Sequence, residues 1–170
     1  LAAYRNGTKW GLLTGFVYAV VQMLLGFKTV SAFFMPGSDS YMVLWKAVCV
    51  CLIDYIIAYT VLGLGGIFRN KIKNPSVSLC VGSIFALSLR YIAHIISGFI
   101  FFGTWADWFF SQDGFTLGAK ILEKFSGQGL AFLYSVIYNG LYMIPEIIIT
   151  AIVALIIGRV PQISGRKNTK

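Results

Sequence analysis

Four acidic or basic side chains stand deep inside long apolar stretches of this sequence, well away from their ends. They are Asp54, Arg90, His94 and Glu146. A carboxylate or guanidinium at the depth of a membrane costs about 2.5–3.5 kcal/mol even on a lenient insertion scale. Each of these side chains therefore needs either a partner or a function, and they are the first candidates for chemistry.

Other polar and aromatic residues recur beside these charges at helical spacing. Arg90, Tyr91 and His94 are three or four residues apart, which places them on one helix face. The last apolar stretch repeats aromatic and polar residues in steps of four, with an asparagine alongside: Tyr134, Tyr138, Tyr142, Glu146 and Asn139. Such stripes should face the interior of a helix bundle or a wet cavity.

Together these residue types describe a site for a small, planar, polar ligand, either neutral or cationic. A desolvated cation over an aromatic ring gains up to about 2 kcal/mol, and Asp54 would supply the countercharge. His94 and Asn139 offer donors and acceptors to the edge of a heteroaromatic ring. A purely structural interpretation stays open: Arg90 could form an ion pair with Asp54 or Glu146 that only holds helices together. By the same argument His94 could be a satisfied core donor, and Asn139 could join two helices.

Motifs of other chemistries are missing from the sequence. It has no P-loop, no HExxH and no GxSxG, and its single histidine leaves no second one for a metal site or a catalytic triad. We therefore predict that the protein is not an enzyme, and we predict no catalytic residue, no metal site and no cofactor.

The composition indicates which elements must position these residues. Of 170 residues, 58% are hydrophobic and 12% charged, about half the charged share of a soluble domain. The mean hydropathy is +0.78. Apolar stretches cover about residues 10–27, 41–68, 75–102 and 129–158, each long enough to cross a bilayer as a helix. The sequence thus predicts an all-α, integral membrane bundle with four transmembrane helices, forming a single domain over residues 1–170.

The distribution of charge predicts the orientation of these spans. Four crossings place both ends of the chain and the middle loop on one side. That side collects basic residues and no acid: Arg5, Lys9, Arg69, Lys71, Lys73, Arg159, Arg166, Lys167 and Lys170. The positive-inside rule makes this side cytoplasmic, so both termini are expected there. Because the net charge of +8 lies in these flanking positions, it indicates membrane lipid as a partner and argues against nucleic acid.

The second outer loop, residues 103–128, is rich in aromatic residues, including Trp105 and Trp108. Two interpretations remain for them. They could form an interfacial aromatic belt, where Trp is common, or a lid over a cavity that opens outward.

Several short motifs resemble one known family. They are, in chain order, Arg5-Asn6-Gly7, Gly11-Leu12-Leu13-Thr14-Gly15, Leu52-Ile53-Asp54-Tyr55, Gly65-Gly66-Ile67-Phe68-Arg69, the run Leu89 to Gly98 with its Arg-Tyr-x-x-His-x-x-x-Gly pattern, and Tyr134-Ser135-Val136-Ile137-Tyr138-Asn139-Gly140. Across nearly the whole chain the sequence resembles the thiamine-binding S-component of energy-coupling-factor (ECF) transporters, the ThiT/YuaJ family.

The resemblance implies a function and a set of partners. Members capture thiamine (vitamin B1) outside the cell and deliver it inward while docked on an ECF transmembrane coupling subunit with two ATPase subunits. The implied location is the bacterial cell membrane, as a multi-pass protein. The family fold has six helices, and the segment Arg5-Asn6-Gly7 aligns just after the second of them. We therefore expect the first two helices, with their docking surface for the coupling subunit, to be missing from this chain.

The resemblance also implies ligand contacts at particular positions. Asp54 stands where the family has an acidic ligand contact, with Tyr55 beside it, and three further residues match ligand-contacting positions: His94, Tyr134 and Asn139. Phe102 takes an aromatic position that is Trp in some members, so stacking on the ligand should persist but be weaker. We expect Trp105 to compensate for this weaker stacking. Two alternatives to a thiamine S-component remain: an S-component for a thiamine precursor or another vitamin, and a structural membrane subunit that binds no ligand.

Overall fold

The computed structural model describes residues 1–161, and within that part of the chain every regular element is a helix. Four helices are long and apolar enough to cross a membrane: α2 (Thr8–Leu25), a composite helix over Leu44–Gly66, α6 (Pro75–Phe101) and α9 (Gly127–Ile157). This confirms the predicted all-α membrane bundle. The apolar side chains on the outer surface of α2 and α9, such as Leu24 and Ile149, are exposed as lipid contact requires.

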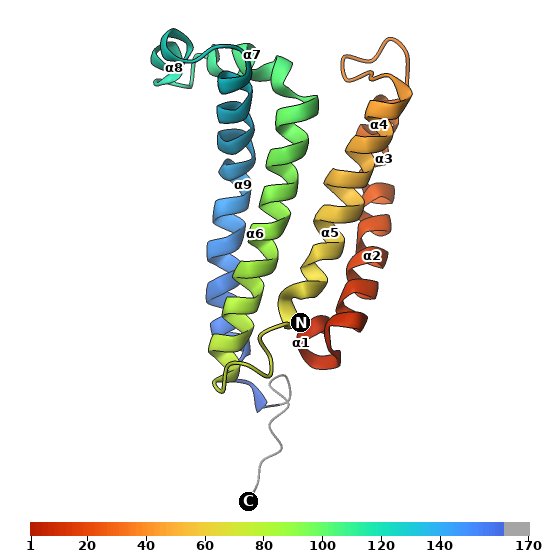
Figure 1. Cartoon of the computed structure of the whole chain (residues 1–170), viewed down its shortest axis with the longest axis vertical. Helices are drawn as coiled ribbons and strands as arrows, with labels where there is room; N and C mark the ends of the chain where they lie inside the picture. Colours follow the sequence, from red (N-terminus) through yellow and green to blue (C-terminus); the bar gives the residue numbers. More distant parts are fainter. Residues whose placement is uncertain (162–170) are drawn as a thin grey trace, which may run out of the picture.

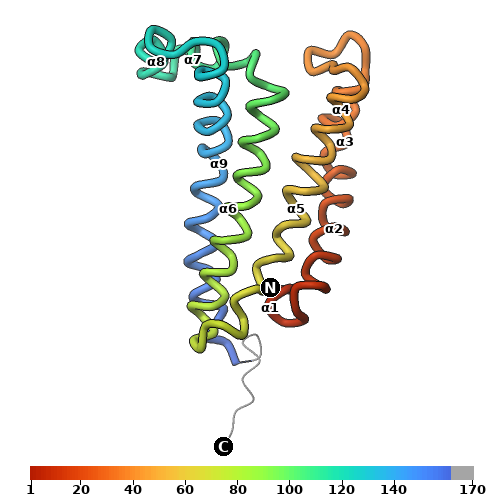
Figure 2. Tube along the Cα trace, viewed as in Figure 1, coloured from red at the N-terminus to blue at the C-terminus, as the bar shows by residue number. Residues whose placement is uncertain are grey.

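Shorter helices lie at the ends of these spans. They are α1 (Ala2–Asn6), α3 (Phe27–Ala32), η3 (Gly103–Trp105), α7 (Ala106–Phe110) and α8 (Gly118–Lys124). In Figure 1, α1 lies at the lower end of the bundle with the N-terminus, while α7 and α8 lie at the upper end. The turn that follows α3 is also at the upper end, on the opposite side from α7 and α8 (Figure 2).

The composite helix is not a uniform α-helix. It starts as α4 (Leu44–Val50), widens into the π-helix η1 (Cys51–Ile57), returns to α5 (Ala58–Thr60) and tightens into the 3₁₀-helix η2 (Val61–Gly66). Asp54 lies at the centre of the π-helix. Because a π-helix closes its hydrogen bonds at i→i+5, it changes the direction in which later side chains point, and such segments are frequent at functional sites.

Glycines allow α2 to lie directly against the composite helix. A Cβ added to Gly15 would come within 2.9 Å of the carbonyl oxygens of Tyr59 and Thr60. One turn earlier, Gly11 faces Gly63 at equally close range. Small residues four apart thus let two backbones approach, as in other membrane helix pairs.

The helices α6 and α9 form the second close pair, and they run side by side in Figure 1. The α6 helix begins at Asn74, whose side chain accepts hydrogen bonds from the amides of Ser76 (3.0 Å) and Val77 (3.3 Å). Near its other end Gly98 packs against Ser135, leaving no room for a Cβ. The composite helix lies between α2 and this pair, since Gly65 of η2 also packs against Gly82 of α6.

Charged residues separate between the two ends of the bundle. The lower end in Figure 1 carries exposed basic residues: Arg5, Lys9, Arg69, Lys71, Lys73 and Arg159. Among the described residues, no Asp or Glu falls in the segments at that end. Arg166, Lys167 and Lys170, which the prediction of orientation also used, lie outside the described residues.

Candidate functional site

A cavity of about 420 Å³ lies between the composite helix on one side and α6 and α9 on the other. Its wall is formed by Thr29, Phe33, Ser40, Val50, Asp54, Tyr55, Tyr59, Arg90, His94, Gly98, Phe102, Tyr134, Tyr138, Asn139 and Tyr142. The volume falls within the range of about 300–1,000 Å³ that is usual for small-molecule sites. The composite helix and α9 contribute both aromatic and polar side chains to the wall, whereas α6 contributes Arg90, His94 and Gly98.

The part of the cavity near the upper end of the bundle is aromatic. Phe33 and Phe102 meet edge to face, with ring centroids 6.1 Å apart. Across from them on α9, the rings of Tyr134 and Tyr138 are 5.4 Å apart and inclined by 34°. Phe109 of α7 packs on both tyrosines from behind, with ring centroids at 5.4 and 5.8 Å. The loop helix α7 therefore supports this wall without belonging to it.

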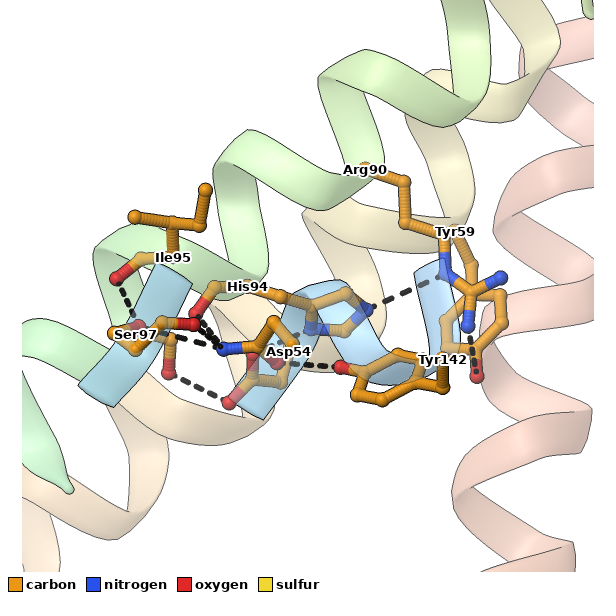
Figure 3. Close-up of polar contacts among 9 residues, drawn as sticks. Asp54, Tyr59, Arg90, His94, Ile95, Ser97 and Tyr142 are labelled. Atoms are coloured by element: carbon orange, nitrogen blue, oxygen red, sulfur yellow. Dashed lines mark hydrogen bonds and ion pairs between the residues drawn. The ribbon is translucent and has the colours of Figure 1, made fainter. Parts of the chain in front are cut away.

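Asp54 is the acidic group of the cavity, and two side chains of α6 hold it. The Ser97 hydroxyl donates to Oδ2 at 2.6 Å, and His94 Nδ1 lies 2.8 Å from Oδ1. Figure 3 shows both contacts bridging from α6 to η1. The Asp54 side chain is 19% exposed, so it still faces the open part of the cavity.

Arg90 lies one helical turn from His94 and is surrounded by partners. Its Nη1 forms an ion pair with Glu146 Oε1 at 2.7 Å, and its Nη2 donates to the Tyr59 hydroxyl at 3.3 Å. The guanidinium also lies over the ring of Tyr59, 4.5 Å from the centroid. Finally, Arg90 Nε donates to His94 Nε2 at 3.3 Å (Figure 3). A continuous polar chain thus runs from Glu146 to Ser97.

Asn139 joins α9 to α6 deep in the wall. Its Nδ2 donates to the Ser135 carbonyl at 2.8 Å and to the His94 carbonyl at 3.3 Å. Its Oδ1 accepts from the Tyr142 hydroxyl at 2.5 Å. Since an amide oxygen has two lone pairs, Oδ1 keeps one acceptor position for a ligand. The residue is well placed both to hold the helices together and to face the cavity.

Two comparisons with known proteins indicate the same family. The family model for the thiamine transporter protein (Thia_YuaJ) matches residues 1–111. A curated protein from Bacillus subtilis (strain 168), named thiamine transporter ThiT, is 31% identical over 162 residues, which cover 90% of this chain and 67% of that protein. The chain belongs to the thiamine transporter family. No solved structure matches it significantly.

Membership of the thiamine transporter family confirms the predicted resemblance. It also confirms that the protein is a membrane transport component and not an enzyme. The stretch covered by the family model contains the cavity residues of the composite helix and of α6, among them Asp54 and His94. The cavity residues of α9 lie beyond that stretch.

Most residues singled out in the sequence lie around one cavity. Six of the seven expected ligand contacts line it: Asp54, Tyr55, His94, Phe102, Tyr134 and Asn139. Trp105, the seventh, is not among the lining residues; its ring meets that of Trp108 at 5.7 Å, edge to face, on the upper surface. Trp105 is the last residue of the 3₁₀-helix η3, which follows α6 and Phe102. Arg90 pairs with Glu146, while Asp54 pairs with His94.

Sequence reasoning missed other residues of this site. Ser97 follows His94 by three positions, so helical spacing alone could have placed it on the same face. Tyr59 follows Tyr55 by four positions and could have been found in the same way. Phe33 lies in the loop directly after α3, where no periodicity applies. Its approach to Phe102 depends on how that loop folds back over the bundle, because Met42 donates its amide proton to the Phe33 carbonyl at 2.9 Å.

Charge determines what this arrangement can do chemically. Arg90 is matched by Glu146, so the carboxylate of Asp54 is left without a cationic partner if His94 is neutral. Counted together with Glu146, which is not itself a lining residue, the charged groups in the described part of the wall then sum to one negative charge amid aromatic rings. Such a site suits a flat ligand with one positive charge.

Proposed function

We propose that the cavity binds thiamine and that the chain is the substrate-binding subunit, or S-component, of an ECF-type transporter. The observation that carries the proposal is the Asp54 carboxylate, which faces an aromatic cavity while Arg90, the one arginine among the described lining residues, is paired with Glu146. Thiamine combines a cationic thiazolium ring with an aminopyrimidine. The charge and the aromatic walls suit the first ring, and polar edges such as those of Asn139 suit the second.

The proposal extends to the direction of transport. The cavity approaches the end of the bundle that is opposite the six basic residues, whose side is cytoplasmic by the positive-inside rule. The chain would then capture thiamine from outside the cell, in the plasma membrane of a bacterium, with its N-terminus in the cytoplasm. As the resemblance to ECF S-components implies, the energy for transport would come from other subunits, a transmembrane coupling subunit and two ATPases.

A calorimetric titration of the detergent-purified chain tests the binding proposal. None of the four tryptophans lines the cavity in the described chain, so heat is a more direct readout than tryptophan fluorescence. We expect saturable binding of thiamine with one site per chain. Its neutral pyrimidine half and its cationic thiazolium half should each bind more weakly, because each fills part of the cavity.

The outcomes separate the alternatives. Tight binding of the pyrimidine half with no gain from the thiazolium would replace thiamine by a precursor as the ligand. No heat from any of the three compounds would contradict a thiamine site and favour a purely structural role for the charged residues. Partner subunits are tested separately, by co-purification of the tagged chain with a co-expressed coupling subunit and ATPases.

A further inference from the structure

We infer that Arg90 is a positioning residue, which holds His94 in a single neutral tautomer and thereby keeps the Asp54 carboxylate available as an anion for a cationic ligand. This inference rests on the proposed function, because it explains how the cavity selects a positive charge. It assigns Arg90 a role beyond the ion pair with Glu146.

The tautomer follows from the contact between Arg90 and His94. Arg90 Nε lies 3.3 Å from His94 Nε2 with its proton directed at that atom. A guanidinium has only donors, so Nε2 must accept and cannot itself carry a proton. The ring proton is therefore on Nδ1, from which it points to Asp54 Oδ1 at 2.8 Å. Both ring nitrogens are then satisfied by a neutral imidazole.

The other protonation states of His94 fit these neighbours poorly. A proton on Nε2 alone would face the N–H of Arg90 and would leave the Nδ1 lone pair against the Asp54 carboxylate. Protons on both nitrogens would satisfy Asp54 but would place a second cation against Arg90. Only the Nδ1–H tautomer makes both contacts favourable.

The tautomer sets the charge of the polar chain. The ionisable groups around His94 are Asp54 and Tyr55 on η1, Tyr59 on α5, Arg90 on its own helix, and Tyr142 and Glu146 on α9. With neutral tyrosines and a neutral imidazole, two carboxylates and one guanidinium leave a net charge of −1. An imidazolium at His94 would bring that sum to zero and remove the attraction for a cation.

The chain offers a direct spectroscopic test because it contains one histidine. Protein with ¹⁵N-labelled imidazole gives one signal for each ring nitrogen, and protonated and unprotonated nitrogens differ widely in chemical shift. At neutral pH we expect Nδ1 to be of the protonated type and Nε2 of the unprotonated type. An Nε2–H tautomer or an imidazolium in the unchanged protein would overturn the inference, whether or not thiamine binds.

Two variants separate the positioning role from the ion pair. Glu146→Gln leaves Arg90 unmatched but keeps its N–H on His94, so we expect one tautomer and an affinity for thiamine about tenfold lower, because the net charge becomes zero. Arg90→Met combined with Glu146→Gln restores the net charge of −1 without a donor for Nε2. We expect this double variant to fold, since apolar or neutral replacement of a buried ion pair is often tolerated.

In the double variant Nε2 should gain protonated character, and the affinity for thiamine should again fall about tenfold. In Glu146→Gln the fall comes from the changed net charge, whereas here it comes from the loss of a single neutral tautomer at His94. If instead the double variant kept the pure Nδ1–H tautomer and bound thiamine as well as the unchanged chain, Asp54 alone would position the ring and Arg90 would have only its ion-pair role. If the unchanged chain showed the expected tautomer but bound no thiamine, the proposed function would fail while the tautomer assignment would stand.

Discussion

The side of α6 that packs on α9 and the side that faces the cavity both carry polar groups, yet they are built differently. Toward α9, the Tyr91 hydroxyl donates to the Val136 carbonyl at 2.7 Å, and the Ser135 hydroxyl donates to the Ile95 carbonyl at 2.8 Å. These groups are uncharged, and each bond ends on a backbone oxygen. They give helix contact without placing any charge in the membrane.

Toward the cavity, α6 presents charged and ionisable groups: Arg90, which also reaches Glu146 of α9, and His94, with Ser97 beside them. A hydrogen bond between membrane helices contributes on average about 0.6 kcal/mol, whereas a charge at that depth costs several times as much. Contacts that only hold helices together are therefore expected to be uncharged hydrogen bonds, like those on the α9 side. The comparison indicates that changes on the cavity side should affect ligand binding most, and changes on the α9 side should affect stability most.

The substitution Asp54→Asn should have the largest effect on binding. It keeps the size of the side chain and an acceptor oxygen for His94 Nδ1, turns the position facing Ser97 into an amide donor that the Ser97 hydroxyl can accept, and removes the negative charge that faces the cavity. Loss of one partner from a desolvated charge pair costs about 2–5 kcal/mol, so thiamine affinity should fall about a hundredfold or more in calorimetry. The matched control is Asp107→Asn, an exposed carboxylate of α7 outside the cavity. Equal losses in the two variants would show that general surface charge attracts the ligand and that Asp54 has no special part.

The substitution Gly98→Ala should come next, because Gly98 belongs to both sides of the comparison. Its added Cβ would meet the Ser135 hydroxyl and lie 3.1 Å from Asn139 Nδ2, so either these side chains must shift, which would disturb the bond from Ser135 to the Ile95 carbonyl, or α6 and α9 must move apart. Overpacking of this kind costs about 1–3 kcal/mol, which should appear as a lower melting temperature in detergent together with weaker binding.

The control for this glycine lies on α9. At Gly129 an added Cβ would be 3.9 Å from the nearest heavy atom, so Gly129→Ala should be neutral or slightly stabilising. If both glycines tolerated Ala equally, the close contact between α6 and α9 would not limit stability. That result would contradict the expectation that changes on the α9 side of α6 affect stability most.

The fold could be predicted from the sequence because lipid leaves few alternatives. Long apolar stretches must become helices, since the backbone finds no other hydrogen-bonding partners in the bilayer. The π-helix around Asp54 could not be predicted in this way. Nothing in the composition of Cys51–Ile57 distinguishes it from an α-helix, and its geometry arises where the composite helix packs against its neighbours.

The candidate site could be predicted in part, because a polar residue in an apolar span stands out. Which residues pair could not be predicted. Arg90 stood between two acids in the sequence, and only the rotation of α6 and α9 directs it to Glu146 and leaves Asp54 to His94. The position of Trp105 depends in the same way on the short η3 turn, which spacing along a helix does not describe.

A third prediction compares two aromatic residues at the upper end of the bundle. Phe102 lines the cavity and Trp105 does not, although both were expected to contact the ligand. Phe102→Ala should lower thiamine affinity about threefold to tenfold, as expected for loss of one aromatic contact. Trp105→Ala should change it less than about twofold by the same reasoning. A larger loss in Trp105→Ala would show that the loop closes over the bound ligand, as the lid interpretation expects.

The smallest effect is expected on the α9 side, for Tyr91→Phe. The change removes only the hydroxyl that donates to the Val136 carbonyl and leaves the ring against Gly140, where it packs closely. A membrane interhelical hydrogen bond of this type is worth about 0.6 kcal/mol, so the melting temperature in detergent should fall slightly. Thiamine affinity should stay unchanged, because Tyr91 does not line the cavity. If affinity fell while stability held, the bond to α9 would control the position of the cavity wall, and the two sides of α6 would act as one unit.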